Sequence, residues 1–170
     1  MPTVSIVRSE ETSKAVSKAI DLIGGPNRFF NKQDFVFIKP NVCGGVPGKR
    51  GTFTSLEFLS AMVSLLKPRV KRMAIGEADS SMYLADRMLK ENGITDCASV
   101  LGIDVVNLSQ GDLAEVPVQE GYVLDSIKVN RVLSEATKIV SAPVAKTHVT
   151  TEVTLNLKNM FGMLPERKKG

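Results

Sequence analysis

Short runs of β-branched and apolar residues alternate along the chain with stretches in which apolar residues recur at helical spacing. In one such stretch Leu59, Met62, Val63 and Leu66 fall on a single stripe, which predicts a helix with one buried face. Strands that alternate with helices are typical of βαβ units. The predicted strands are 3–8, 34–40, 72–78, 104–108 and 137–144, and the predicted helices are 9–25, 55–66, 80–93 (capped by Ser80 or Ser81) and 94–102.

This order of elements predicts one α/β domain over residues 1–170, with a mainly parallel sheet flanked by helices in a Rossmann-like three-layer arrangement. We expect the run 137–144 to be a fifth strand, in the centre of the sheet. Residues 109–136 fit the alternation less well and predict a small β excursion with a hairpin or short strands. The stretch 153–162 alternates like a strand but also fits a helix stopped by Gly162, and the sequence leaves this choice open.

The composition, 43% hydrophobic and 24% charged over 170 residues, is that of a globular protein able to bury a full core. A net charge of +4 favours anionic ligands, but the positive charges are interspersed with acids and aromatic residues are few. We therefore do not expect a nucleic-acid surface. No apolar run approaches the length of a membrane span, and two cysteines make no disulfide framework, so we expect a cytoplasmic protein.

Three predicted strands end in polar loops marked by glycine or proline, namely "KPNVCGG", "GEADSS" and "APVAKTH". Ligands of open parallel sheets bind outside the carboxyl ends of the strands. Each loop alone can be a simple turn, because the same residue types dominate turns. Three such loops at one edge, two of them with a lysine near the strand end, favour a ligand site.

Lys39 ends an apolar run, so its ammonium group must emerge at the sheet edge. There it either reaches solvent or faces a carboxylate or phosphate as a fixed positive charge. We expect Asn41 and the backbone N–H groups of Gly44 and Gly45 to add neutral donors beside it. The loop matches neither a P-loop nor a dinucleotide-binding fingerprint, so it specifies no nucleotide.

Glu77 and Asp79 follow the third predicted strand. Glu77 is a candidate for acid/base chemistry, whereas Asp79 is expected to favour the N-terminus of the next helix. His148, the only histidine, is the second acid/base candidate, and a role in capping a turn is equally open. A mixed metal site of these three residues with Cys43 is not required by their spacing, and we predict no metal.

In the segment after the last predicted strand, Lys146, Thr150, Thr154, Lys158 and Gly162 recur every four residues. This spacing keeps them on one face of a strand and nearly so on a helix. We expect that face to line a cleft, and the opposite face to pack through its apolar residues. The predicted packing residues are Val153, Leu155 and Leu157, with Met160 as a further candidate. The predicted ligand-binding residues are Lys39, Asn41, Gly44, Gly45, Lys146, Thr147, Thr150, Thr154, Lys158 and Asn159.

The motifs "VFIKPNVCGG", "GEADSS", "GIDVVNL" and above all "SAPVAKTHVTTEVTLNLKNMFGMLP" resemble the domain-of-unknown-function family numbered 362. Many relatives in that family are fused to ferredoxin-type domains. The resemblance therefore implies a ferredoxin-type partner, while the lack of a cysteine run implies no iron–sulfur cluster in this chain. Family members continue well past "FGMLP", which implies a truncated, split or minimal version here.

Together these patterns predict a protein that binds a small anionic metabolite or cofactor at the carboxyl edge of its sheet. The alternative is a non-catalytic module that docks an iron–sulfur electron-transfer partner. The sequence leaves the substrate, the cofactor and the question of catalysis open.

Overall fold

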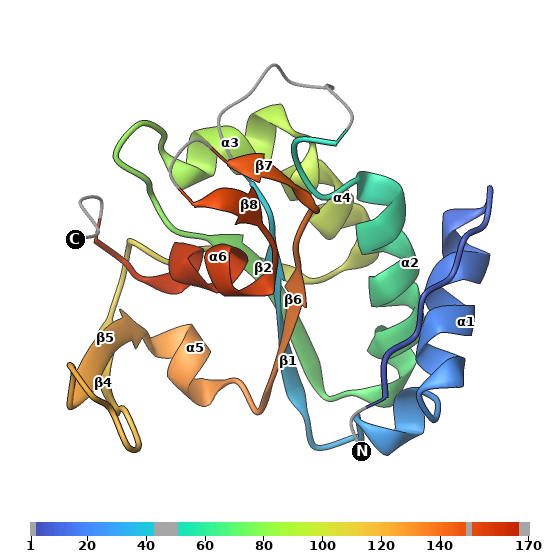
Figure 1. Ribbon diagram of the computed structural model, residues 1–170, viewed down its shortest axis with the longest axis horizontal. Helices are drawn as coiled ribbons and strands as arrows, with labels where there is room; N and C mark the ends of the chain where they lie inside the picture. Colours follow the sequence, from blue (N-terminus) through green and yellow to red (C-terminus); the bar gives the residue numbers. More distant parts are fainter. Residues whose placement is uncertain (1–2, 43–50, 149–150, 167–170) are drawn as a thin grey trace.

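A parallel sheet of four strands lies at the centre of the computed structural model, which describes residues 3–42, 51–148 and 151–166. The strand order is β3-β2-β1-β6 (Figure 1). The α/β fold predicted from the sequence is thereby confirmed. The strands are β1 (Phe35–Pro40), β2 (Arg72–Glu77), β3 (Asp104–Asn107) and β6 (Lys138–Ala142).

The central position of β1 explains its continuous apolar sequence. Every residue of this strand is buried, because the strand pairs with β2 on one side and β6 on the other and is covered on both faces. The register places Lys39 beside Ser141 and Pro40 beside Ala142. The last residues of β1 and β6 therefore lie next to each other at the carboxyl edge.

One face of the sheet is covered by helices. The predicted stripe of α2, from Leu59 to Leu66, is buried against Val36 and Ile38 of β1. The α2 helix begins after Ser55, whose side chain accepts a hydrogen bond from the backbone N–H of Phe58. The helices on this side are α1 (Thr12–Leu22), α2 (Leu56–Leu66), α3 (Ala85–Glu91) and α4 (Ile94–Leu101), with short 3₁₀ turns η1 (Pro26–Arg28) and η2 (Lys67–Arg69).

The opposite face is covered by the excursion predicted at residues 109–136, which contains an antiparallel hairpin as expected and, in addition, a short helix (Figure 1). A second apolar cluster joins Phe37 of β1 to Val129 and Leu133 of the excursion. The elements are β4 (Leu113–Pro117), β5 (Ser126–Asn130) and α5 (Arg131–Glu135).

The segment that follows β6 lies at the carboxyl edge of the sheet. It forms an antiparallel ribbon of β7 (Lys146–His148) and β8 (Glu152–Thr154), then α6 (Asn156–Met160) and a 3₁₀ turn η3 (Phe161–Met163). The choice left open for 153–162 is thus resolved as a short end of strand followed by a helix.

Two strand predictions were wrong. Residues 3–8 are extended but belong to no strand of the described sheet; instead the Ser5 hydroxyl donates to the Ala19 carbonyl oxygen of α1 at 2.7 Å. The run 137–144 contains β6 as predicted, but β6 pairs only with β1 and is an edge strand rather than a central one. Without residues 3–8, the sheet has no further described strand to cover this edge.

The predicted start of the third helix was also wrong. The helix α3 begins at Ala85, because residues 80–83 form a turn in which the Ser80 hydroxyl accepts from the backbone N–H groups of Met82 and Tyr83. The cap at the N-terminus comes from Asp79, whose Oδ1 accepts from the Ala85 N–H at 2.8 Å. The helix-favouring role predicted for Asp79 is therefore confirmed.

Candidate functional site

The chain changes direction across the sheet at the carboxyl ends of β1 and β6. From β1 it proceeds through β2 to β3 on one side, and it then returns to β6 on the other side of β1. Ligands of open α/β sheets bind at such a reversal, outside the carboxyl ends of the strands. The candidate residues Lys39 and Asn41 follow directly from β1 at this point.

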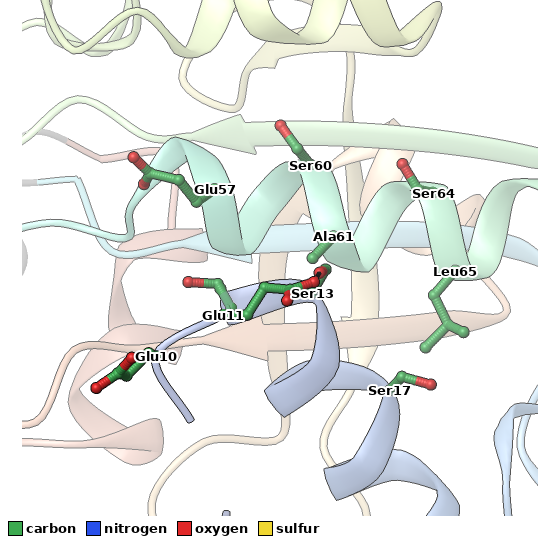
Figure 2. Close-up of a pocket in the computed structure, with 10 residues that line it drawn as sticks. Glu10, Glu11, Ser13, Ser17, Glu57, Ser60, Ala61, Ser64 and Leu65 are labelled. Atoms are coloured by element: carbon green, nitrogen blue, oxygen red, sulfur yellow. Dashed lines mark hydrogen bonds between the residues drawn. The ribbon is translucent and has the colours of Figure 1, made fainter. Parts of the chain in front are cut away.

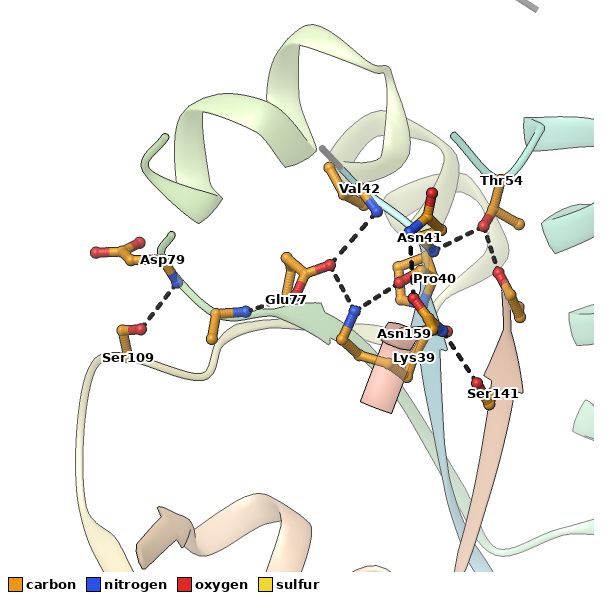
Figure 3. Close-up of polar contacts among 12 residues, drawn as sticks. Lys39, Pro40, Asn41, Val42, Thr54, Glu77, Asp79, Ser109, Ser141 and Asn159 are labelled. Atoms are coloured by element: carbon orange, nitrogen blue, oxygen red, sulfur yellow. Dashed lines mark hydrogen bonds and ion pairs between the residues drawn. The ribbon is translucent and has the colours of Figure 1, made fainter. Parts of the chain in front are cut away.

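Lys39 and Glu77 form a buried ion pair at this edge. Lys39 is 1% exposed, and its Nζ lies 2.5 Å from Oε2 of Glu77, the last residue of β2 (Figure 3). Nζ also donates to the Pro40 carbonyl oxygen at 2.6 Å, and the backbone N–H of Ala78 donates to Glu77 Oε1 at 3.1 Å. Lys39 therefore does not reach solvent but faces the carboxylate of Glu77 within the chain.

Burial lowers the pKa of Lys39, because the low-polarity surroundings disfavour the charged ammonium group. The carboxylate of Glu77 opposes this effect, and the positive charge of Lys158 reinforces it.

The turn η3 covers this ion pair at Gly162. A Cβ atom at position 162 would lie 2.5 Å from Glu77 Oε1 and 3.0 Å from Lys39 Cε. The Gly162 carbonyl oxygen also accepts from the Ala78 N–H at 3.3 Å. The absence of a side chain is thus what allows the turn to close over the ion pair.

Two asparagines connect the ion pair to the neighbouring segments (Figure 3). The Asn159 side-chain Nδ2 donates to the Lys39 carbonyl oxygen and to the Ser141 hydroxyl, both at 3.0 Å. The Asn41 Nδ2 donates to Asn159 Oδ1 at 3.5 Å, and both asparagines are buried. Helix α6 is thereby held against β1 and β6 by polar contacts.

Lys146 joins the same network from β7. Its Nζ donates to Asn41 Oδ1 at 2.6 Å and also to the carbonyl oxygen of Thr52. The register of the β7–β8 ribbon places Thr154 directly opposite Lys146. The Thr154 hydroxyl is buried and, within the described residues, has no hydrogen-bond partner. A buried polar atom without a partner is uncommon and calls for a physical explanation.

Lys158 completes the group of cations. Its Nζ lies 5.5 Å from the centre of the Phe161 ring, and no carboxylate of the described residues lies within ion-pair distance of it. Lys39, Lys146 and Lys158 thus all belong to the segments at the carboxyl edge, and among them Lys39 is paired with Glu77.

The polarity predicted for the last segment was partly inverted. Val153, Leu155 and Leu157 are 52%, 54% and 91% exposed, whereas Thr154 and Asn159 are buried. The apolar face that was expected to pack points outward, because the opposite, polar face makes the contacts with β1 and β6. The predicted cleft wall is thus a packed network rather than the side of an open cleft.

The remaining predicted residues occupy different positions. Thr147 alternates with its neighbours in β7, so it lies on the ribbon face opposite to Lys146 and His148 and is exposed. The His148 Nδ1 accepts from the Thr151 N–H at 3.3 Å. Gly44, Gly45 and Thr150, together with Cys43 of the mixed metal site that the spacing did not require, lie outside the described residues.

Thr54 and Ser141 also belong to the network, although the sequence patterns did not predict a role for them. The Thr54 hydroxyl accepts from the Asn41 N–H at 2.8 Å and donates to the Ala142 carbonyl oxygen at 2.6 Å. Ser141 holds Asn159. The signal for Ser141 is its place as a polar residue in an apolar strand, whereas the link from Thr54 to Asn41 spans a loop and is visible only in three dimensions.

Two hollows on the described surface lie away from these lysines. One, of about 680 Å³, lies between α1 and α2 and is lined by acids and hydroxyls such as Glu10, Glu57 and Ser60 (Figure 2). The other, of about 400 Å³, lies beside β6 and is mainly apolar. Within the described residues no group of three histidine, cysteine or acidic side chains is placed to hold a metal ion.

Comparison with known families decides what kind of protein carries this network. The model of a domain of unknown function, DUF362, matches residues 36–170, which begin at the second residue of β1 and include the ion pair and the whole of the carboxyl-edge segment. The chain belongs to the DUF362 family. The resemblance seen in the sequence motifs is thus confirmed, and the lysine network described above lies entirely within the DUF362 domain.

A distant relative of this DUF362 chain is a thylakoid-associated protein of Synechocystis sp., which is 24% identical over 173 residues. The match covers 98% of this chain and 52% of that protein, so the chain spans about half the length of its relative. No solved structure matches significantly. In the described part of the chain, no helix is both long enough and apolar enough to cross a membrane.

Proposed function

We propose that this DUF362 chain binds a small anionic metabolite or cofactor at the carboxyl edge of β1, β2 and β6. The observation that carries the proposal is the side-chain network at this edge, in which Lys39 is paired with Glu77 and Lys146 donates to Asn41 Oδ1. Lys158 of α6 adds a third ammonium group near this edge. Ammonium groups beside neutral amide and hydroxyl groups form charge-assisted hydrogen bonds with carboxylates and phosphates.

Two further features support binding at this edge. The reversal of strand order next to Lys39 is the position at which open α/β sheets bind ligands. The Thr154 hydroxyl, buried without a partner opposite Lys146, supplies a donor to a bound anion or to a water that accompanies it. Lys146, Lys158 and Thr154 are therefore the proposed ligand contacts, with Asn41 and Asn159 holding them in place.

The geometry favours binding over catalysis by Glu77. Its carboxylate already accepts from Lys39 Nζ and from the backbone N–H groups of Val42 and Ala78. A carboxylate held in this way is a counter-charge and is poorly placed to remove a proton from a ligand. We propose His148, on the same ribbon face as Lys146, as the group that would take an acid/base role if the ligand reacts.

The proposal is tested by calorimetric titration with inorganic phosphate, citrate and a nucleoside monophosphate as probes. We expect at least one probe to bind, and Lys146→Ala or Lys158→Ala to weaken its binding about tenfold, because each removes a charged hydrogen bond. Lys18→Ala is the matched control, since Lys18 is an exposed lysine of α1 on the far side of the sheet. Equal affinity in all four proteins would refute the proposal.

A second candidate function is docking of a ferredoxin-type electron-transfer protein. It is favoured by the exposed apolar residues of β8, α6 and η3, namely Val153, Leu155, Leu157 and Phe161, of which Phe161 lies with its ring centre 5.5 Å from Lys158 Nζ. Monomeric proteins rarely expose contiguous apolar patches, and such patches mark interaction sites. Titration with a purified ferredoxin, compared between the unchanged chain and Leu157→Asp, tests it. Absence of binding, or binding unchanged by Leu157→Asp, would exclude docking at this patch.

A further inference from the structure

The N-terminal segment Thr3–Arg8 has the sequence of a strand but makes no strand pairing in the described sheet. Val4 and Ile6 are 83% and 92% exposed, which is unusual for two β-branched residues so close together. The segment runs along α1, antiparallel to that helix and in the same direction as β1 (Figure 1). It lies against α1, where the Ser5 hydroxyl donates to the Ala19 carbonyl oxygen.

The edge of β6 is open and lies beside an apolar hollow. Within the described residues β6 pairs with β1 alone, so its other side offers unpaired backbone groups to a further strand. The adjoining hollow of about 400 Å³ is lined by Ile20 of α1, Ile23 just after that helix, Met62 of α2 and Val140 of β6, among others. A strand paired with β6 would lie over this hollow and would cover it with every second side chain.

The handedness of crossover connections decides which edge of the sheet can accept the segment. Parallel strands are joined by right-handed crossovers in almost all proteins. A strand at 3–8 placed beside β6 would connect through α1 to β1 in the same direction as β1 connects to β2 and β2 to β3. Right-handed connections then place α1 on the same face as α2, and α1 does pack there. A strand beside β3 would require α1 on the opposite face.

We propose that the open edge of β6 and the adjoining hollow form a strand-acceptor surface, and that the segment Thr3–Arg8 of the same chain leaves its place on α1 to occupy it in a second conformation, added parallel to β6. In this arrangement Val4 and Ile6, which share one face of an extended chain, turn toward the hollow. The five-stranded sheet would have the order β3-β2-β1-β6 followed by the added strand. This proposal is independent of the proposed anion binding.

The sharpest test uses Ile6→Asp in the full chain. A residue that is 92% exposed tolerates a charge, whereas a residue that fills an apolar hollow does not. If the segment pairs with β6, Ile6→Asp lowers the thermal midpoint by roughly 5 °C. It also speeds hydrogen exchange of the outward-facing amides of β6. The matched control is Val100→Asp on α4, where the side chain is 88% exposed and no strand is proposed.

The outcomes separate three arrangements. A fall in the midpoint together with faster exchange in 138–142, both for a monomer, supports the proposal. If Ile6→Asp behaves like Val100→Asp and exchange in β6 is unchanged, the segment stays on α1 and the proposal is overturned. If both effects occur only in a dimer and depend on protein concentration, the segment is exchanged between copies and its assignment to the same chain is overturned.

Discussion

At the scale of single residues, the position of Lys39 is determined by a partner on the neighbouring strand. A lysine at the end of a buried strand has no stable place in an apolar core unless a counter-charge and carbonyl oxygens surround it. Glu77, the last residue of β2, supplies the carboxylate, and the Pro40 carbonyl oxygen supplies the second acceptor. The ion pair thus holds the carboxyl ends of β1 and β2 next to each other.

Removing one partner of this pair is expected to be costly. Lys39→Met should lower the free energy of unfolding by about 3–5 kcal/mol, because it leaves the buried carboxylate of Glu77 without its cation. Lys39→Met combined with Glu77→Gln should recover part of this loss, since the neutral amide keeps an acceptor for the Ala78 N–H. Urea unfolding measures the free energy of unfolding of the unchanged chain, of Lys39→Met and of the double variant.

The control for this pair is a surface ion pair of the same kind. At the exposed start of α1, Lys14 Nζ lies 2.6 Å from Glu11 Oε2. Lys14→Met should lower the free energy of unfolding by no more than about 1 kcal/mol. If Lys39→Met were as mild as Lys14→Met, the Lys39–Glu77 pair would not be buried in solution.

Asp34, at the opposite edge of the sheet, makes stability depend on acidic pH. The Thr137 hydroxyl donates to Oδ1 and the Asn31 N–H donates to Oδ2, each at 2.8 Å. The Thr137 bond is the largest cause that lowers the pKa of Asp34 below 3.8, and desolvation opposes it. Since the folded-state pKa is the lower one, Asp34 stabilises the fold above its unfolded pKa, and this stability is lost as pH falls through the folded value.

Thr137→Val removes that donor and raises the folded-state pKa of Asp34 toward its ordinary value. We therefore expect acid unfolding, followed by circular dichroism, to occur at a higher pH than in the unchanged protein. Thr95→Val on α4 is the control, because the Thr95 hydroxyl makes no described bond to a carboxylate. Coincident acid transitions for all three proteins would show that Asp34 does not govern acid stability.

At the scale of elements, the start of α3 shows how a cap can be displaced along the chain. The sequence offers Ser80 or Ser81, but the bond to Ala85 comes from Asp79 across a turn. Asp79→Ala should lower the free energy of unfolding by about 0.5–2 kcal/mol. Ser81→Ala should change it by no more than about 0.5 kcal/mol, since the Ser81 side chain has no described bond. The opposite ranking would mean that Ser81 caps the helix.

The elements that the sequence predicted well are those that one dominant pattern determines. The stripe of α2 and the apolar run of β1 each have a single consistent burial, so their type and position follow from the residues alone. The segment from Val153 to Leu157 has two possible faces, and its orientation is set by Asn159 and Lys146 binding to distant partners. Such partners cannot be identified from spacing within the segment.

At the scale of the whole molecule, the lysine network is held together by segments far apart in the sequence. Asn41 contacts Lys146 and Asn159, which lie more than a hundred positions further along the chain. The sequence placed these residues at the same edge of the sheet, because parallel strands end together there. It did not predict that α6 would close over the edge, because that closure depends on the lack of a side chain at Gly162.

The closed turn at Gly162 also affects any measured affinity. If the anion reaches Lys39, only molecules in which α6 and η3 have lifted can bind it. The apparent dissociation constant is then the intrinsic one divided by the open fraction. Gly162→Ala, whose Cβ would lie 2.5 Å from Glu77 Oε1, enlarges that fraction. We expect it to lower the thermal midpoint and yet tighten binding in calorimetry.

If Gly162→Ala lowers the thermal midpoint and tightens binding, the ligand must displace the closed turn in order to bind, and the turn is not part of its site. Weaker stability with unchanged affinity would instead mean that the anion stays on Lys146 and Lys158, outside the cover. An unchanged midpoint would contradict the close packing at Gly162 itself. One glycine thereby sets how much of the intrinsic affinity of this edge a ligand can use.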